Sequence, residues 1–338
     1  MKRLVIISGG GALGAFGAGT LAALNHDYTT VAGISTGALM SPLVALNRWD
    51  LLKEAYTSVT DKDVFDTKWW KPKPFKKNGK LNKKAVIFSL LAGTETLATS
   101  HSMRKLIDKF LTEEDFKRIK AFEKELIVAA QNINESPSRI HYFSSKNTGF
   151  ENYKDWMWCS ANAPFFTSLV RKEWTDVDGK KYIGEWTDGG LSELLILQEN
   201  LFKFADEVDI IVHRVKPTPV KQRGFVKDIV HNLERTVDAM RYDIEFEDGI
   251  LYDKLQQISN EKQIKINVYW LPFKLTDNSL QFSKKEMLKW WEMGFATAFD
   301  ENRIDRIVPV VMDNTYKQTS NEEKHVNSII NPNYGSTS

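Results

Sequence analysis

Short apolar runs separated by glycine-rich turns dominate the beginning of the chain. Residues 3–8 (RLVIIS) form an apolar run that stops at three glycines, which is typical of a strand buried on both faces of a parallel sheet. The pattern then predicts a small, apolar helix over 15–24 and a second strand over 29–33. A second helix is expected over 36–46, although Pro42 lies inside it. The order strand, helix, strand, helix predicts a right-handed parallel sheet covered on both faces.

The rest of the chain continues this α/β pattern. Further strands are expected over 125–131, 139–144, 182–186, 208–215 and 264–270, and residues 225–258 are expected to be mostly helical. Ser283 and Glu286 belong to the sequence S-K-K-E, a capping box that predicts the start of an amphipathic helix. Since neither an internal repeat nor a long Gly/Ser linker divides the sequence, we expect one domain over 1–315 and a polar, flexible tail over 316–338.

The N-terminus resembles a targeting signal, because Lys2 and Arg3 precede an uncharged stretch over 4–26. Six glycines lie between Gly9 and Gly19, and each costs about 1 kcal/mol relative to alanine in a helix interior. The stretch also lacks a clean small-x-small cleavage site. We therefore expect buried core at this end, with no signal peptide and no transmembrane segment, in a cytoplasmic protein.

The composition is that of an ordinary globular protein, with 338 residues, 42% of them hydrophobic and 27% charged. Disordered, collagen-like and coiled-coil classes are therefore excluded. The single cysteine, Cys159, excludes an internal disulfide and a multi-cysteine metal site, and is interpreted as a small buried hydrophobe.

Positive charge is concentrated in one place, since residues 68–84 hold eight lysines and no acid, interleaved with Trp69, Trp70 and Phe75. We interpret the surrounding segment, about 66–85, as an insertion in the domain. A local basic segment argues against a general nucleic-acid binder, whose charge would cover a whole face. It favours peripheral contact with an anionic membrane, against the alternative of a solvated loop without a partner.

Gly33 to Gly37 (GISTG) fits the G-x-S-x-G pattern at a junction between an expected strand and an expected helix. A sharp turn at such a junction needs glycine on both sides of the serine, because side chains there would collide with the neighbouring strand and helix. Gly33 and Gly37 would then form a nucleophile elbow that presents Ser35 at the carboxyl end of the sheet. Ser35 is therefore the candidate nucleophile.

The glycines at 9, 10, 11 and 14 allow two interpretations. They fit the dinucleotide fingerprint G-x-G-x-x-G, which requires an acidic residue about 20 positions later to hold a ribose hydroxyl. Ser35 occupies that place, so a nucleotide-binding oxidoreductase is disfavoured. The favoured interpretation is that Gly9, Gly10, Gly11 and Gly14 form an oxyanion loop, whose N–H groups stabilise developing negative charge.

Two later motifs complete a pattern. Asp188-Gly189-Gly190 follows an expected strand, and alone it would be read as a plain D-G turn. Ser160 to Pro164 (SANAP) forms a serine-x-x-x-proline element. With the two glycine motifs, these elements make the chain resemble the patatin-like phospholipase family, closely over about 1–195 and more loosely to about residue 300.

The resemblance implies a three-layer α/β/α fold with a central, mostly parallel sheet. It also implies a serine esterase of the phospholipase A type, which acts on phospholipids or related lipid esters without a metal or cofactor. Ser35 would be the nucleophile and Asp188 the general base, while Ser160, Pro164, Gly189 and Gly190 would support the site. The chain departs from the family at Leu13, where members often carry Lys or Arg, and at Leu194 and Ile196, where N-x-P is common.

Two alternatives to this interpretation remain. His213 could complete a triad with Ser35 and Asp188, because the chain order suits an α/β-hydrolase. It lies within an expected strand, however, so a structural role is favoured. The other alternative is a catalytically inactive lipid-binding or scaffold protein that keeps the fold, against which the presence of both Ser35 and Asp188 argues.

Overall fold

The structure is a computed structural model, and it describes residues 1–67, 70–74, 76, 82–164, 166–175, 179, 181–216, 250–276 and 278–310. The expected tail over 316–338 lies outside these residues. So does most of the expected helical range, up to residue 249, and so do parts of the basic segment.

One sheet organises the chain, with the strand order β5-β6-β3-β2-β1-β7-β8-β9 and with β4 on the free edge of β3. Its central strands β3, β2, β1, β7 and β8 are parallel, whereas β4, β5, β6 and β9 pair in the antiparallel sense. The strands are β1 (Arg3–Ile7), β2 (Thr30–Gly33), β3 (Glu125–Asn132), β4 (Arg139–Ser144), β5 (Val170–Thr175), β6 (Lys181–Asp188), β7 (Glu207–Val215), β8 (Lys265–Leu271) and β9 (Ile304–Ile307).

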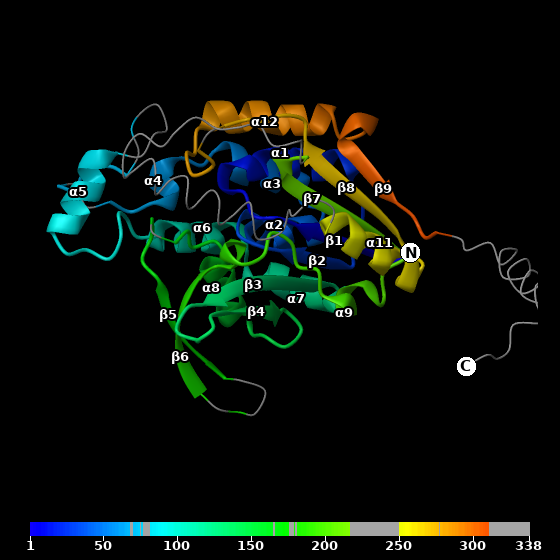
Figure 1. Cartoon of the computed structure of the whole chain (residues 1–338), viewed down its shortest axis with the longest axis horizontal. Helices are drawn as coiled ribbons and strands as arrows, with labels where there is room; N and C mark the ends of the chain where they lie inside the picture. The colour runs from blue at the N-terminus through cyan, green and yellow to red at the C-terminus, as the bar shows by residue number, and fades with distance from the viewer. Residues whose placement is uncertain are drawn as a thin grey trace, which may run out of the picture.

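Both faces of the central strands are apolar, which is why their sequences read as continuous hydrophobic runs. In β1, Val5 and Ile7 face one hydrophobic core, while Leu4 and Ile6 face the other. All four side chains are almost fully buried. The sheet is therefore the middle layer of a three-layer structure (Figure 1).

Most helices cover the Val5 face. This layer contains α1 (Gly14–Leu24), α2 (Thr36–Ala45), α3 (Trp49–Thr57), α6 (His101–Phe110), α7 (Glu113–Ala121), α8 (Phe150–Ser160) and α12 (Lys284–Ala296). The opposite face is covered by α9 (Glu199–Phe202) and α11 (Ile250–Lys262), together with residues 194–196. Two further helices, α4 (Asp61–Val64) and α5 (Lys83–Leu91), extend away from the sheet at one end of the molecule (Figure 1). Within the described ranges, no helix combines the length and the apolar composition that crossing a membrane requires.

The mostly parallel sheet with flanking helices confirms the predicted fold, and the expected strands and the first two helices match within two residues at either end. Pro42 is accommodated inside α2 because the hydroxyl of Ser41 donates to the carbonyl of Ala38, the group that the missing N–H would have served. The helix expected to begin at Ser283 is confirmed as α12, but the predicted capping box is wrong. Ser283 is the N-cap of α12, but its side chain makes no capping hydrogen bond.

Candidate active site

Ser35 lies in a strained turn between β2 and α2. Its backbone has φ 56° and ψ −120°, a combination that is rare for a residue with a side chain. A Cβ atom on Gly33 would collide with the backbone of Gly37, and a Cβ atom on Gly37 would collide with the carbonyl oxygen of Ile7 in β1. Both glycines are thus required by close backbone packing. The turn places Ser35 at the N-terminus of α2, where the helix dipole favours negative charge.

The register of the sheet brings Asp188 to the same place. Gly33, at the end of β2, pairs with Val128 of β3, and Asp188, at the end of β6, pairs with Ala130 of β3. Since β4 occupies the other edge of β3, β2 and β6 share one edge. The partners of Gly33 and Asp188 are therefore only about 7 Å apart along β3. Both Ser35 and Asp188 line one cavity and are 8% exposed.

A short segment at the end of α8 ties the two residues together. The hydroxyl of Ser160 accepts a hydrogen bond from the N–H of Ser35 at 3.0 Å. Two residues later, the carbonyl oxygen of Asn162 accepts the N–H of Asp188 at 3.1 Å and the hydroxyl of Thr187 at 2.9 Å. Ser160 and Asn162 are fully buried. This segment therefore sets the position of the elbow relative to the end of β6.

The turn after Asp188 is equally constrained. The N–H of Gly190 donates to Oδ1 of Asp188 at 2.7 Å, which orients the carboxylate. A Cβ atom on Gly189 would lie 2.7 Å from the carbonyl oxygen of Ala129, so glycine is needed where this turn passes β3. Pro164 is buried in the turn that follows α8.

The glycine loop passes directly beside Ser35. A Cβ atom on Gly9 would lie 3.2 Å from Cβ of Ser35. Gly11 has φ 54° and begins a short 3-10 helix, η1 (Gly11–Leu13), so the N–H groups at Gly10 and Gly11 have no acceptor within that helix. The N–H of Ala12 is bound to the carbonyl oxygen of Ser279 at 2.8 Å.

Gly14 is placed differently from the other loop glycines. Its N–H donates to the carbonyl oxygens of Gly11 and Ala12, and a Cβ atom on it would collide with Thr36 and Tyr56. Gly14 is therefore needed for close packing, and its N–H is bonded within the loop and does not point to an oxyanion.

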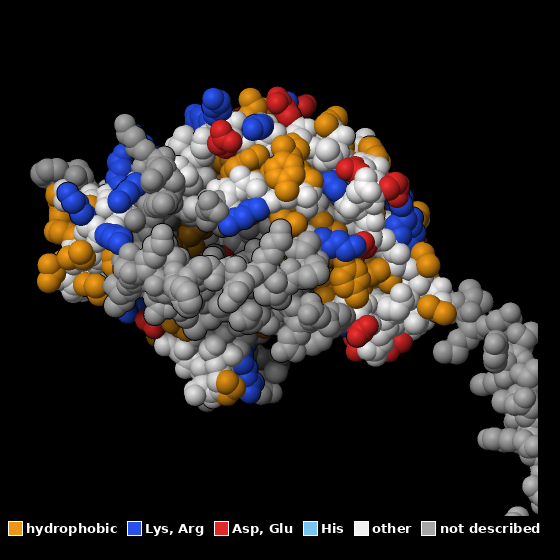
Figure 2. Space-filling view, turned by 45° about the horizontal axis from the view of Figure 1, so that its top comes forward, with side chains coloured by type: hydrophobic (Ala, Val, Ile, Leu, Met, Phe, Trp, Pro, Cys, Tyr) orange, Lys and Arg blue, Asp and Glu red, His pale blue; other side chains and the backbone are white. Residues whose placement is uncertain are grey.

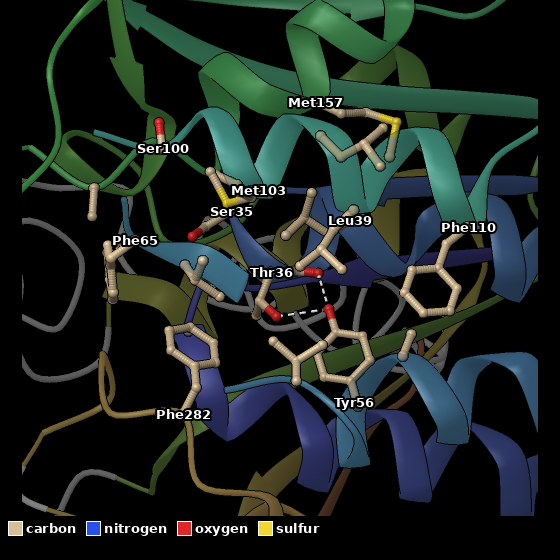
Figure 3. A pocket seen from close by; sticks show the side chains of 18 of the residues that line it. Ser35, Thr36, Leu39, Tyr56, Phe65, Ser100, Met103, Phe110, Met157 and Phe282 are labelled. Carbon is tan, nitrogen blue, oxygen red and sulfur yellow. Dashed lines mark hydrogen bonds between the residues drawn. The ribbon is translucent and has the colours of Figure 1, made fainter. Parts of the chain in front are cut away.

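Ser35 opens into a cavity whose walls are otherwise mainly apolar. Ser35, Leu39 and Leu43 are four residues apart, so they share one face of α2 and mark out about 12 Å along the cavity. Figure 3 shows Ser35 and Phe110 on opposite sides of the view, with Leu39 between them. These mainly apolar walls suit an apolar group of a ligand. Further wall residues are Pro42, Val59, Val64, Phe65, Met103, Leu106, Ile107, Leu111, Met157, Leu280, Phe282 and Met287.

Two polar groups are hydrogen-bonded here, namely Tyr56, which lines the cavity, and Asp61, which binds the wall residue Phe282. The hydroxyl of Tyr56 lies 2.7 Å from both the hydroxyl and the carbonyl oxygen of Thr36 (Figure 3). Burial raises the pKa of Tyr56, so it stays neutral. Asp61 accepts the N–H of Phe282 at 2.6 Å, and burial raises its pKa as well.

His213 lies in β7 and is buried beneath the glycine loop. Its Nδ1 is 3.0 Å from the carbonyl oxygen of Ser8, and its backbone N–H donates to the hydroxyl of Ser8 at 2.8 Å. That hydroxyl donates in turn to the carbonyl oxygen of Gly9. Burial lowers the pKa of His213 to about 4. These contacts assign His213 to the support of the loop.

Cys159 is fully buried, and burial raises the pKa of its thiol, so it is unsuited to nucleophilic chemistry. Among the residues that the structure describes, no three His, Cys, Asp or Glu side chains are arranged to hold a metal ion.

The motifs include Ser35, Asp188 and Gly11, which line the cavity, but they did not predict the contacts that position these residues. The carbonyl of Asn162 and the carbonyl of Ser279 were missed. Asn162 lies inside the serine-x-x-x-proline element, which was the available signal, whereas nothing in the sequence around Ser279 marks its contact with the glycine loop.

The match to a known protein family agrees with this arrangement of motifs. The sequence matches the family described as Patatin-like phospholipase over residues 5–198, more than half of the chain. No curated protein matches it. Among solved structures, VipD from Legionella pneumophila is similar with a TM-score of 0.42 and 12% identity, over 97% of this chain and 74% of that one. The family match spans the glycine loop, the elbow and the D-G-G turn, and on this ground the chain belongs to the patatin-like phospholipase family.

Proposed function

We propose that the protein is a lipid acyl hydrolase in which Ser35 and Asp188 form a catalytic dyad. The oxygen of Ser35 attacks the ester carbonyl carbon while its proton passes to the carboxylate of Asp188. The tetrahedral intermediate collapses, and the departing alkoxide takes the proton from Asp188. Water then attacks the acyl-serine, giving its proton to Asp188, and Ser35 recovers a proton as the fatty acid leaves.

The observation that carries this proposal is the cavity, where Ser35 and the carboxylate of Asp188 both line a mainly apolar space. An acyl chain is the part of a lipid ester that such a wall accommodates, because its burial removes apolar surface from water. The row Ser35, Leu39, Leu43 supplies a path for the chain away from the reacting carbonyl.

Stabilisation of the oxyanion is assigned to the glycine loop. The N–H groups of Gly10 and Gly11 are at the start of η1, and Gly9 packs against Ser35. Donors of this kind act without reorganisation when charge develops on the carbonyl oxygen. The N-terminus of α2 adds a favourable field at the same point.

Labelling with a fluorophosphonate tests the nucleophile, since an active serine hydrolase is modified covalently and a lipid-binding scaffold is not. Mass spectrometry should place the label on Ser35. A mixed phospholipid panel should then release free fatty acid and lysolipid. Absence of both label and fatty acid would favour the scaffold alternative.

The Ser160→Ala variant should lower kcat by about ten- to a hundredfold with little change in KM, because the elbow loses the acceptor that holds the N–H of Ser35. Ser145→Ala is a matched control. Its buried hydroxyl accepts the N–H of Leu126 at 2.9 Å, near the start of β3 and away from the elbow. Steady-state kinetics on a soluble ester would contradict the positioning role if both variants lost the same activity.

We also propose that the basic segment helps to hold the enzyme on anionic bilayers. Replacing Lys71, Lys73, Lys76 and Lys77 by Gln should weaken sedimentation with anionic vesicles, since each lysine contributes about 1 kcal/mol near such a surface. Hydrolysis of a soluble ester should stay unchanged. The control replaces four lysines on α7 and α12, namely Lys117, Lys120, Lys285 and Lys289. If the two variants bind anionic vesicles equally at low salt, the segment is a solvated loop without a membrane role.

A further inference from the structure

The segment that carries α5 is joined to the rest of the protein at a neck formed by Asp66 and Thr99. Asp66 and Thr99 form an isolated antiparallel bridge, with N–H to oxygen distances of 2.8 and 3.0 Å. Phe65 and Ser100, the next residues on either side, both line the cavity that contains Ser35. The segment that carries α5 is therefore attached at the edge of that cavity.

Helix α5, which lies between Asp66 and Thr99 in the sequence, carries apolar side chains on its outer face. Ala85 and Ser89 are buried, so this side of the helix packs against the protein. Ile87, Leu90 and Leu91 are 55%, 75% and 84% exposed. Their spacing of three and four residues places them on one face. A solvated helix shows the reverse pattern, with polar residues outside.

The C-terminal end of α5 is closed by its own backbone. Gly93 has φ +60°, its N–H donates to the carbonyl oxygen of Leu90 at 3.2 Å, and the N–H of Thr94 donates to that of Ser89 at 3.0 Å. This is a Schellman arrangement, which satisfies carbonyl groups that a helix end otherwise exposes. Because these carbonyl groups are already hydrogen-bonded within the chain, this end of α5 can enter a less polar medium without leaving them unpaired.

In the sequence, the charges that precede α5 and lie on it have a single sign. The sequence holds eight lysines and no acidic residue between Asp66 and Glu95. Lys83 and Lys84 precede Ile87 by one turn on the same face of α5. Figure 1 shows α5 at one end of the molecule, and Figure 2 shows hydrophobic and basic side chains together at that end. Two such surfaces repel each other, so a second copy is a poor occupant.

We propose that α5 is an interfacial anchor for anionic bilayers, with Ile87, Leu90 and Leu91 in the boundary between headgroups and acyl chains. Lys83 and Lys84 contact the anionic headgroups. Apolar burial combined with basic charge is the chemistry by which helices lie in this boundary. The inference builds on the proposed function, because the neck then keeps the Ser35 cavity next to its lipid substrate.

Insertion can be measured without turnover, in a Ser35→Ala background. Leu91→Cys offers a unique labelling site, because the native Cys159 is fully buried. An environment-sensitive dye at residue 91 should brighten and shift to the blue with phosphatidylglycerol vesicles. The same dye on Ile183→Cys, an exposed position in β6, should not respond. No change at residue 91, or an equal change at both positions, would overturn the anchor.

A binding assay separates the apolar contribution from the electrostatic one. The triple variant Ile87→Gln, Leu90→Gln and Leu91→Gln should lower vesicle partitioning by more than about tenfold, because three apolar side chains no longer leave water. The deficit should persist at about 1 M salt, where screening removes most lysine attraction. The control replaces Leu288, Phe295 and Phe299 by Gln, apolar side chains exposed on or after α12.

Equal partitioning by these two triple variants would overturn the proposal. So would sedimentation velocity showing that the parent is a dimer which the α5 variant dissociates, since a second copy would then cover the surface. Both readouts are independent of hydrolysis, so failure of the acyl hydrolase proposal would appear in the fluorophosphonate experiment instead.

Discussion

Ser35→Ala and Asp188→Asn should each remove nearly all ester hydrolysis while leaving the protein folded. The first change removes the nucleophile and the second removes the proton acceptor, and each loss should lower kcat by about a thousandfold or more. The double variant should be no worse than the more damaged single variant, because the two groups act as one unit. Turnover of a soluble ester, at matched folded fraction from circular dichroism, checks the expectation.

The Asp188→Asn change should preserve the local turn, so it separates the loss of proton transfer from a loss of structure. The N–H of Gly190 donates to Oδ1 of Asp188, and an asparagine oxygen can accept the same bond. The turn should therefore persist while proton transfer is lost. Ser35→Ala retaining more than about a tenth of parental turnover would rule out the dyad.

The fold was predictable where the sequence pattern is local. The run at 3–8 is apolar at every core position because β1 is buried on both faces, and the glycines at 33 and 37 mark a turn that no larger residue permits. The strand β5 and the helices between Trp49 and Ala121 were not anticipated. β5 alternates between buried or half-buried and exposed residues at the edge of the sheet, so its pattern is weaker than that of a central strand.

The motifs around Ser35 and Asp188 can be read from the sequence, but only the resemblance to the family predicts that the two residues come together. Ser35 and Asp188 are 153 positions apart, and they approach because β6 enters on the edge of β3 that β2 has left. Antiparallel pairing at that edge is a property of the whole sheet and leaves no local signature. The same holds for the outer face of α5, since its apolar residues look like core until their exposure is known.

His213→Ala should keep substantial activity, within about tenfold of the parent at matched folded fraction, because the residue supports the loop and does not take the proton of Ser35. Its Nδ1 is bound to the carbonyl oxygen of Ser8. Turnover of a short-chain ester measures this directly. A loss of turnover as large as that of Ser35→Ala would instead support a triad that includes His213.

The stability of the fold should depend on pH through the same residue. Burial lowers the pKa of His213 to about 4 in the folded protein, whereas an unfolded histidine titrates near 6.5. Between these values the unfolded chain binds more protons, so the free energy of unfolding should rise with pH up to about 6.5. The contribution is complete above that pH, and about 2 kcal/mol of it is lost by pH 5.

His213→Asn removes this titration while its side-chain amide can still donate to Ser8, so its stability should fall less on acidification. Urea unfolding of parent and variant at pH 5 and pH 7.5 gives the comparison, in which the difference between the two pH values should be larger for the parent. Carboxylates elsewhere titrate in both proteins and cancel in that comparison. Identical pH dependence would mean that the buried imidazole is not the group that senses acid, and the support of the glycine loop would then have to be independent of the charge on His213.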